Sequence, residues 1–101
     1  MLKLYNFIEA RERLGTVITK TKLIHSTVFS NESGNDVYIK PENLQVTGSF
    51  KIRGAYNKIS KLTKEQKEKG LIASSAGNHA QGVAFAAQKL GVKAVIVMPK
   101  Y

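Results

Sequence analysis

Lys51 is the residue of this sequence whose position most suggests chemistry. It lies in the segment Thr47–Ala55, TGSFKIRGA, where Ser49 is a typical helix-capping residue, so we expect Lys51 in the first turn of a helix. The positive end of the helix dipole and the nearby Arg53 both favour the neutral amine, which is the nucleophile that a Schiff base requires. Phe50 is placed to pack against a flat ring. On these residues alone the alternative stays open, because a lysine near a helix start is more commonly an ordinary surface side chain.

A second candidate is the segment Ser74–Gly82, SSAGNHAQG, which joins an expected strand to an expected helix. Backbone N–H groups at that helix start, with Gly77 allowing a close approach, would form a site for a carboxylate or a phosphate. Asn78 adds a side-chain amide and His79 an imidazole. The alternative is an ordinary strand–helix turn, in which Asn78 caps the helix and His79 only packs. These residues alone do not separate the two interpretations.

We compared the same segment with two nucleotide-binding motifs. The dinucleotide fingerprint GxGxxG is absent. Gly77 and Gly82 have the spacing of a P-loop, but Val83 and Ala84 stand where that motif needs a lysine and a hydroxyl residue. Because the contacts to the phosphates and to magnesium would be missing, the sequence excludes a P-loop NTPase.

The elements that must position these residues are clearest in the second half. Apolar residues at helical spacing predict a helix from Ser49 to Leu62, and a capping box predicts a short helix that Gly70 closes. Buried strands are expected at Leu71–Ser74 and Ala94–Met98, with a helix between them that Gly91 ends. Strand, helix and strand in about thirty residues form one βαβ unit, so parallel pairing is expected. A single such unit is not a complete doubly wound domain, which indicates part of something larger.

The first half has weaker signals. A short helix is expected to be capped by Asn6 and ended by Gly15. Leu23–Phe29 is rich in β-branched and aromatic residues and is predicted to be extended. Asn31–Asp36 has the composition of a turn, and Val37–Lys40 reads as a short strand that a proline stops.

Composition limits the class of protein. The formal charge is +9, from sixteen Lys plus Arg against seven Asp plus Glu. Much of the excess lies in the segment Lys58–Lys69, which has no aromatic residues for stacking bases, so a solvated helix face is favoured over a nucleic-acid surface. There are no cysteines. No apolar run approaches the roughly 20 residues of a membrane helix, and the N-terminus does not resemble a secretory signal, so the cytoplasm is the expected location.

Two segments together resemble a known family. Glu42–Ala55 (ENLQVTGSFKIRGA) and Ser75–Gly82 (SAGNHAQG) are similar, in order and spacing, to the two N-terminal signatures of the threonine/serine dehydratases. These are fold-type II enzymes that use pyridoxal 5'-phosphate (PLP), with a tryptophan-synthase β-like fold, and the resemblance runs from about Tyr5 to Tyr101. It implies an α/β fragment of a three-layer α/β/α fold with one βαβ unit at residues 71–98. It also implies that residues 1–48 belong to the large PLP domain and residues 49–101 begin the small domain.

The resemblance assigns roles to the candidate residues. Lys51 would hold PLP as a Schiff base and then take the α-proton of the substrate. Phe50 would lie against the pyridine ring, and Asn78 would hydrogen-bond the ring hydroxyl. The substrate carboxylate would be bound, largely by backbone N–H groups, at Ser75, Ala76, Gly77, Asn78 and His79.

The implied reaction is the conversion of L-threonine to 2-oxobutanoate, or of L-serine to pyruvate, with release of ammonia. Serine racemases usually carry a serine acid/base before the Gly-Asn-His run, where this sequence has Ala76, so the resemblance favours a dehydratase. It implies a small-molecule amino-acid substrate, no nucleic-acid or membrane partner, and a homo-oligomeric parent. The phosphate-binding loop of the family lies farther along the chain, so the 101 residues alone are expected neither to hold PLP firmly nor to turn over substrate. A non-catalytic remnant and a basic binding module remain the alternatives.

Overall fold

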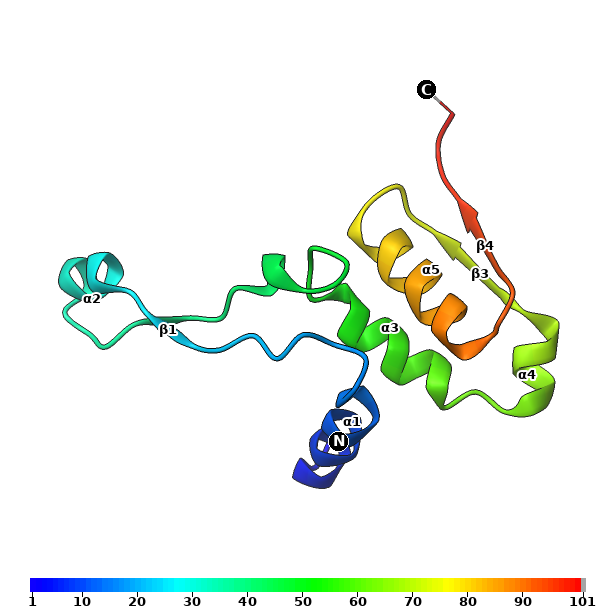
Figure 1. The fold of residues 1–101 in the computed structure, drawn as a ribbon, viewed down its shortest axis with the longest axis horizontal. Helices are drawn as coiled ribbons and strands as arrows, with labels where there is room; N and C mark the ends of the chain where they lie inside the picture. Colours follow the sequence, from blue (N-terminus) through cyan, green and yellow to red (C-terminus); the bar gives the residue numbers. More distant parts are fainter. Residues whose placement is uncertain (101) are drawn as a thin grey trace.

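Two helices that lie side by side, α3 (Lys51–Ser60) and α5 (Asn78–Leu90), form the centre of the fold (Figure 1). The computed structural model describes residues 1–100. Both helices begin at the same end of the pair, and their facing sides carry the buried apolar stripe that the spacing predicts. Ile52 is completely buried there, which contributes about 1.5–3 kcal/mol. The core consists of Ile52, Ala55, Ile59, Val83, Ala86, Ala87 and Val92.

A two-stranded sheet packs against α5. Strand β3 (Leu71–Ser74) pairs in parallel with β4 (Ala94–Val97), and the register joins Leu71 to Ala94 and Ser74 to Val97. The predicted βαβ unit is therefore confirmed, with α5 as its crossover helix.

The two strands are only half-buried, which corrects the expectation of buried strands. Leu71 and Ala73 face the helices, whereas Ile72 between them is 81% exposed. Val97 on β4 is exposed in the same way. The reason is that, within residues 1–100, helices cover one face of the sheet and leave the other face bare. This is the incomplete α/β arrangement that the sequence predicts.

The short helix α4 (Lys64–Lys69) leads into β3 and confirms the predicted capping box. The Thr63 hydroxyl accepts from the Gln66 N–H at 3.2 Å, and the Gln66 carbonyl oxygen Oε1 accepts from the Thr63 N–H at 2.9 Å. Gly70 ends the helix with φ of +80°, and a Cβ there would lie 2.9 Å from the Lys93 carbonyl oxygen. Only glycine fits this turn without strain.

The N-terminal helix α1 (Leu4–Leu14) packs on α3, where Arg13 donates to the Asn57 side chain at 2.9 Å. The prediction that Asn6 caps this helix is wrong. The helix begins earlier, so Asn6 lies in its first turn and its side-chain oxygen accepts from the Lys3 backbone N–H at 2.9 Å. Gly15 ends the helix as expected.

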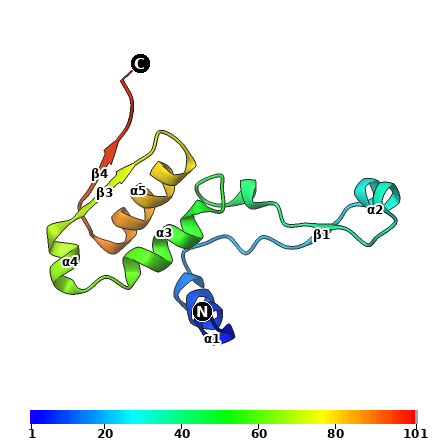
Figure 2. The ribbon, with the colours of Figure 1, turned by 180° about the vertical axis from the view of Figure 1, so that it is seen from behind.

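Between α1 and α3 the chain makes an arm that extends away from the helices in both views (Figures 1 and 2). It carries a short antiparallel pair, β1 (Ile24–His25) and β2 (Tyr38–Ile39), with helix α2 (Thr27–Ser33) between them, and a 3₁₀ helix (Glu42–Leu44) leads back to α3. No helix within residues 1–100 has the length and apolar character to span a membrane.

Helix α2 corrects two predictions. The extended segment Leu23–Phe29 is limited to β1, and the turn Asn31–Asp36 begins only after Ser33. The local reason is that Ser26 caps the helix by accepting from the Phe29 N–H at 3.4 Å.

Candidate active site

Lys51 is the first residue of α3, as the sequence predicts. The residue at the helix cap is Phe50, in right-handed helical conformation, rather than Ser49. Ser49 is buried one position earlier, and its hydroxyl accepts from the Lys51 backbone N–H at 3.4 Å. Ser49 therefore still accepts a hydrogen bond at the start of α3, from the N–H of the first helical residue.

The Lys51 amine and the Phe50 ring are neighbours on an open surface. Lys51 Nζ lies 5.2 Å from the centroid of the Phe50 ring, within the range of a cation–π contact. Phe50 is 58% exposed, so aromatic surface is accessible beside the amine. A planar ligand bound to Lys51 could stack there.

Arg53 does not add free positive charge near Lys51, which corrects the expectation from its position in the sequence. Its guanidinium is bound to Glu42 through two bonds, Nε to Oε2 at 2.7 Å and Nη2 to Oε1 at 2.8 Å. Arg53 and a further bond from the Thr21 hydroxyl lower the pKa of Glu42 to about 2, against the opposing effect of burial. The same contact raises the pKa of Arg53.

The second candidate segment forms the turn between β3 and α5. The Ser75 hydroxyl accepts from the Gly77 N–H and the Ala80 N–H, each at 3.3 Å, so Ser75 makes the capping bonds that the alternative interpretation gave to Asn78. Asn78 is the first residue of α5, and its side chain is exposed. Within residues 1–100, the backbone N–H groups of Asn78 and His79 have no hydrogen-bond acceptor. They are therefore available to an anion at the helix start.

Gly82 brings the two candidate segments together. A Cβ on Gly82 would lie 3.1 Å from the Lys51 carbonyl carbon and 3.2 Å from the Ile52 nitrogen. The backbones of α3 and α5 thus touch where Lys51 begins α3, one helical turn beyond Asn78. Sequence reasoning missed this role, although a glycine inside a helix, which costs about 1 kcal/mol relative to alanine, is a signal that packing requires it.

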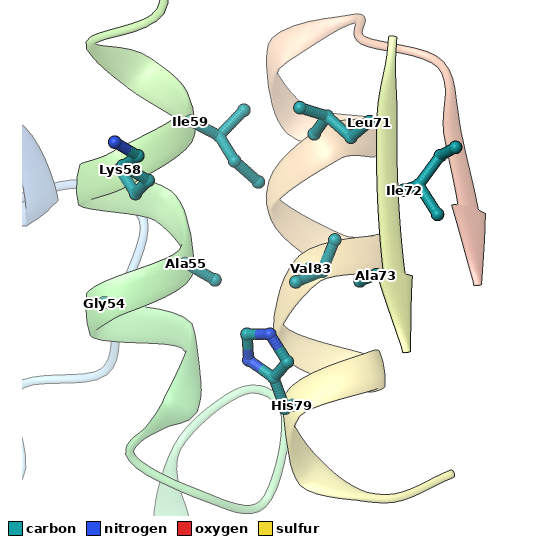
Figure 3. Close-up of a pocket in the computed structure, with 9 residues that line it drawn as sticks. All are labelled: Gly54, Ala55, Lys58, Ile59, Leu71, Ile72, Ala73, His79 and Val83. Atoms are coloured by element: carbon teal, nitrogen blue, oxygen red, sulfur yellow. The ribbon is translucent and has the colours of Figure 1, made fainter. Parts of the chain in front are cut away.

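The His79 ring points into the space between α3 and α5 (Figure 3), although the residue as a whole is exposed. It enters a cavity of about 220 Å³ between α3, α5 and β3, whose apolar lining includes Ile59 and Val83 (Figure 3). His79 can therefore serve the candidate site through its backbone N–H while its ring lies elsewhere.

Comparison with known proteins shows the family. Residues 14–101 match the family described as "Pyridoxal-phosphate dependent enzyme", so the chain belongs to the PLP-dependent enzymes. The L-threonine ammonia-lyase of Thermotoga maritima is 54% identical over 101 residues, which cover 100% of this chain and 25% of that protein. The resemblance to the threonine/serine dehydratases is confirmed.

Solved structures agree with the fold. The T.th. threonine deaminase superposes with a TM-score of 0.84 at 46% identity, covering 97% of this chain and 31% of that one. The serine racemase of Dictyostelium discoideum superposes with a TM-score of 0.91 at 38% identity, covering 98% of this chain and 33% of that one. The expected fold-type II class is confirmed. The chain spans about a quarter to a third of the length of these relatives.

The exposed groups at the two helix starts fit PLP. A Schiff base needs an accessible lysine amine, and Lys51 is exposed. The pyridine ring needs an apolar face, which Phe50 offers, and the ring hydroxyl needs a polar partner, for which the Asn78 amide is free. The chemistry of these three side chains therefore fits the ring of the cofactor.

Proposed function

We propose that this chain is the N-terminal segment of a PLP-dependent L-threonine ammonia-lyase. The enzyme converts L-threonine to 2-oxobutanoate and ammonia, or L-serine to pyruvate and ammonia. One observation carries the proposal: the exposed amine of Lys51 starts a helix whose backbone touches α5 at Gly82, one turn from N–H groups that can bind a carboxylate. The similarity to the ammonia-lyase of Thermotoga maritima supports the choice of reaction.

Each residue has a role in this proposal. PLP, when bound, supplies an electron sink for the carbon that loses its proton. Lys51 would hold the cofactor through Nζ, and the free amine would receive the α-proton of the substrate. Phe50 supports the ring of the cofactor, and Asn78 hydrogen-bonds its hydroxyl.

The substrate carboxylate lies at the start of α5. The free N–H groups of Asn78 and His79 bind it, with the positive end of the helix dipole behind them. Ser75 keeps the turn closed through its bonds to Gly77 and Ala80. The binding segment thus extends over Ser75, Ala76, Gly77, Asn78 and His79. An orienting contact to the carboxylate leaves the Cα–H bond free to point at Lys51.

Elimination rather than racemisation follows from the residues beside the site. Ala76 has no group that could return a proton to the opposite side of the substrate carbon. The hydroxyl of the adjacent Ser75 accepts two backbone N–H bonds and is held in the turn. Racemisation of serine is therefore expected to be slow compared with elimination, and comparable rates would contradict this assignment.

The remaining features of the enzyme are part of the same proposal. Residues 1–48 contribute to the large PLP domain and residues 49–101 to the small domain. The enzyme acts in the cytoplasm as a homo-oligomer on a small amino-acid substrate, without a nucleic-acid or membrane partner. The ion pairs of the basic segment, Lys64 with Glu68 and Lys69 with Glu65, support the absence of a nucleic-acid partner, because they offset part of its positive charge. Salt-dependent binding of DNA to the chain would instead favour a basic binding module.

The activity is tested in the complete enzyme by replacing Lys51 with alanine. Lys51→Ala is expected to abolish formation of 2-oxobutanoate from L-threonine, because both cofactor attachment and proton removal use this amine. Lys61→Ala, at the other end of α3, is the matched control and should retain full activity. A wild-type enzyme without threonine ammonia-lyase activity would refute the proposed function and favour a non-catalytic remnant.

A further inference from the structure

Glu42 and Arg53 connect the 3₁₀ helix to the first turn of α3. Their two parallel bonds, at 2.7 and 2.8 Å, form a bidentate ion pair, which fixes both distance and orientation. The two side chains are largely withdrawn from solvent, with 17% of Glu42 and 30% of Arg53 exposed. Arg53 lies two residues after Lys51, so the ion pair holds the same helical turn that carries the amine.

The Glu42 side of the ion pair is itself anchored. The buried Thr21 hydroxyl donates to Glu42 Oε1 at 2.6 Å, and the Thr21 carbonyl accepts from Lys40 Nζ at 2.8 Å. The buried Gln45 side chain bonds both backbone groups of Thr19, at 3.1 and 2.8 Å. Side-chain hydrogen bonds thus connect residues 19–21 to residues 40–45. The ion pair then connects these two segments to α3.

Within the described chain, the loop of residues 46–50 makes no hydrogen bond to a segment distant in the sequence. The hydrogen bonds of residues 46–50 run only to residues 45–53 within the described chain. Gly48 adopts φ of +66° in this loop, a conformation that glycine takes without strain. The position of Phe50 and Lys51 therefore depends on what holds the two ends of the loop and on the contact with α5 at Gly82.

We propose that Glu42 and Arg53 are positioning residues for Lys51. Their ion pair fixes the first turn of α3, and hence the point from which the Lys51 amine reaches the cofactor and the α-proton. This inference rests on the proposed function. It predicts a defect in the chemical step at sites that are fully loaded with cofactor, which a merely structural ion pair would not produce.

The test compares Glu42→Gln, Arg53→Gln, Arg53→Lys and the double variant Glu42→Gln/Arg53→Gln in the complete enzyme. The cofactor is fixed to its lysine by borohydride reduction, and mass spectrometry then counts the loaded sites. For each variant, kcat per loaded site and KM for L-threonine are measured. Glu9→Gln is the matched control, since Glu9 also pairs with an arginine, Arg13, but on α1.

The expected result is a fall in kcat per loaded site of roughly 10-fold to 100-fold in Glu42→Gln and in Arg53→Gln, because small misplacements of a reacting group cost rates of this order. KM should stay unchanged, because the carboxylate site on α5 is separate from the ion pair. The double variant should match either single variant, since both remove the same contact. Arg53→Lys keeps the charge without the bidentate geometry and should fall between wild type and Arg53→Gln.

A second measurement does not depend on turnover. With PLP removed, the acylation rate of Lys51 by a small reagent should change in Glu42→Gln and Arg53→Lys relative to that of Lys61, and should stay unchanged in Glu9→Gln. Normal kcat per loaded site together with a normal acylation rate in Arg53→Lys would overturn the proposal, even if Glu42→Gln fails to fold. Absence of threonine ammonia-lyase activity in the wild type would instead refute the proposed function and leave the acylation test of the ion pair standing.

Discussion

Replacing Gly82 with alanine tests the helix contact that joins the two halves of the site. The new Cβ would lie 3.1–3.2 Å from the backbone of Lys51 and Ile52, closer than an ordinary van der Waals contact. Since these neighbours are backbone atoms at a helix start, α3 and α5 must move apart by a few tenths of an ångström. Overpacking of this kind costs about 1–3 kcal/mol, whereas the helix propensity of alanine returns about 1 kcal/mol. The net expectation is a loss of stability of up to about 2 kcal/mol.

Gly54→Ala is the matched control, because Gly54 lies inside α3 and a Cβ there meets nothing within 4 Å. This variant should gain up to about 1 kcal/mol from helix propensity alone. Urea unfolding measures both variants, and the difference between their free energies of unfolding isolates the cost of the contact at Gly82. Equal stabilisation by the two substitutions would refute the close approach of α3 and α5.

Three further predictions concern stability. The contact with Arg53 lowers the pKa of Glu42 to about 2, so the ionised carboxylate contributes its full stabilisation above the ordinary pKa of 4.5 and loses it as the pH falls through 2. Acid unfolding followed by circular dichroism should show this loss of stability in wild type. The loss over the same pH range should be smaller in Glu42→Gln. Ser75→Ala removes the acceptor for two N–H groups at the start of α5 and should lower the free energy of unfolding by about 0.5–2 kcal/mol in urea, whereas no loss would contradict the cap. Ile72→Ser should change the free energy of unfolding of the 101-residue chain by less than about 0.5 kcal/mol, because Ile72 is exposed there. The same substitution should destabilise the complete enzyme more, because we expect the bare face of the sheet to be covered in it. Equal effects in the two proteins would contradict that expectation.

Local signals predicted much of the second half of the fold. The capping box at Thr63, the glycine at the end of α4 and the apolar stripe of α5 each act within a few residues, and the structure contains all three. The βαβ unit followed from their order, because a short crossover between parallel strands leaves few other arrangements. The place of Lys51 in the first turn of α3 was likewise predictable from the residues around it.

Contacts between distant residues were not predictable in this way. Arg53 was predicted to add positive charge near Lys51 because the two are close in sequence. Its partner, Glu42, lies eleven residues earlier in the sequence, and the folded arm brings the two side chains together. The exposure of Ile72 had the same cause, since an apolar run does not reveal which face of a strand has a neighbour. In the first half, β-branched residues favoured an extended segment, yet the Ser26 cap starts α2 within it.

Attachment of the cofactor through Lys51 can be tested most directly by mapping the covalent bond in the complete enzyme. The purified protein is reduced with borohydride and digested, and mass spectrometry identifies the modified lysine. We expect a pyridoxyl group on Lys51 and none on the neighbouring Lys58 or Lys61, with the label lost in Lys51→Ala. Modification of another lysine, or a label that persists in Lys51→Ala, would contradict it.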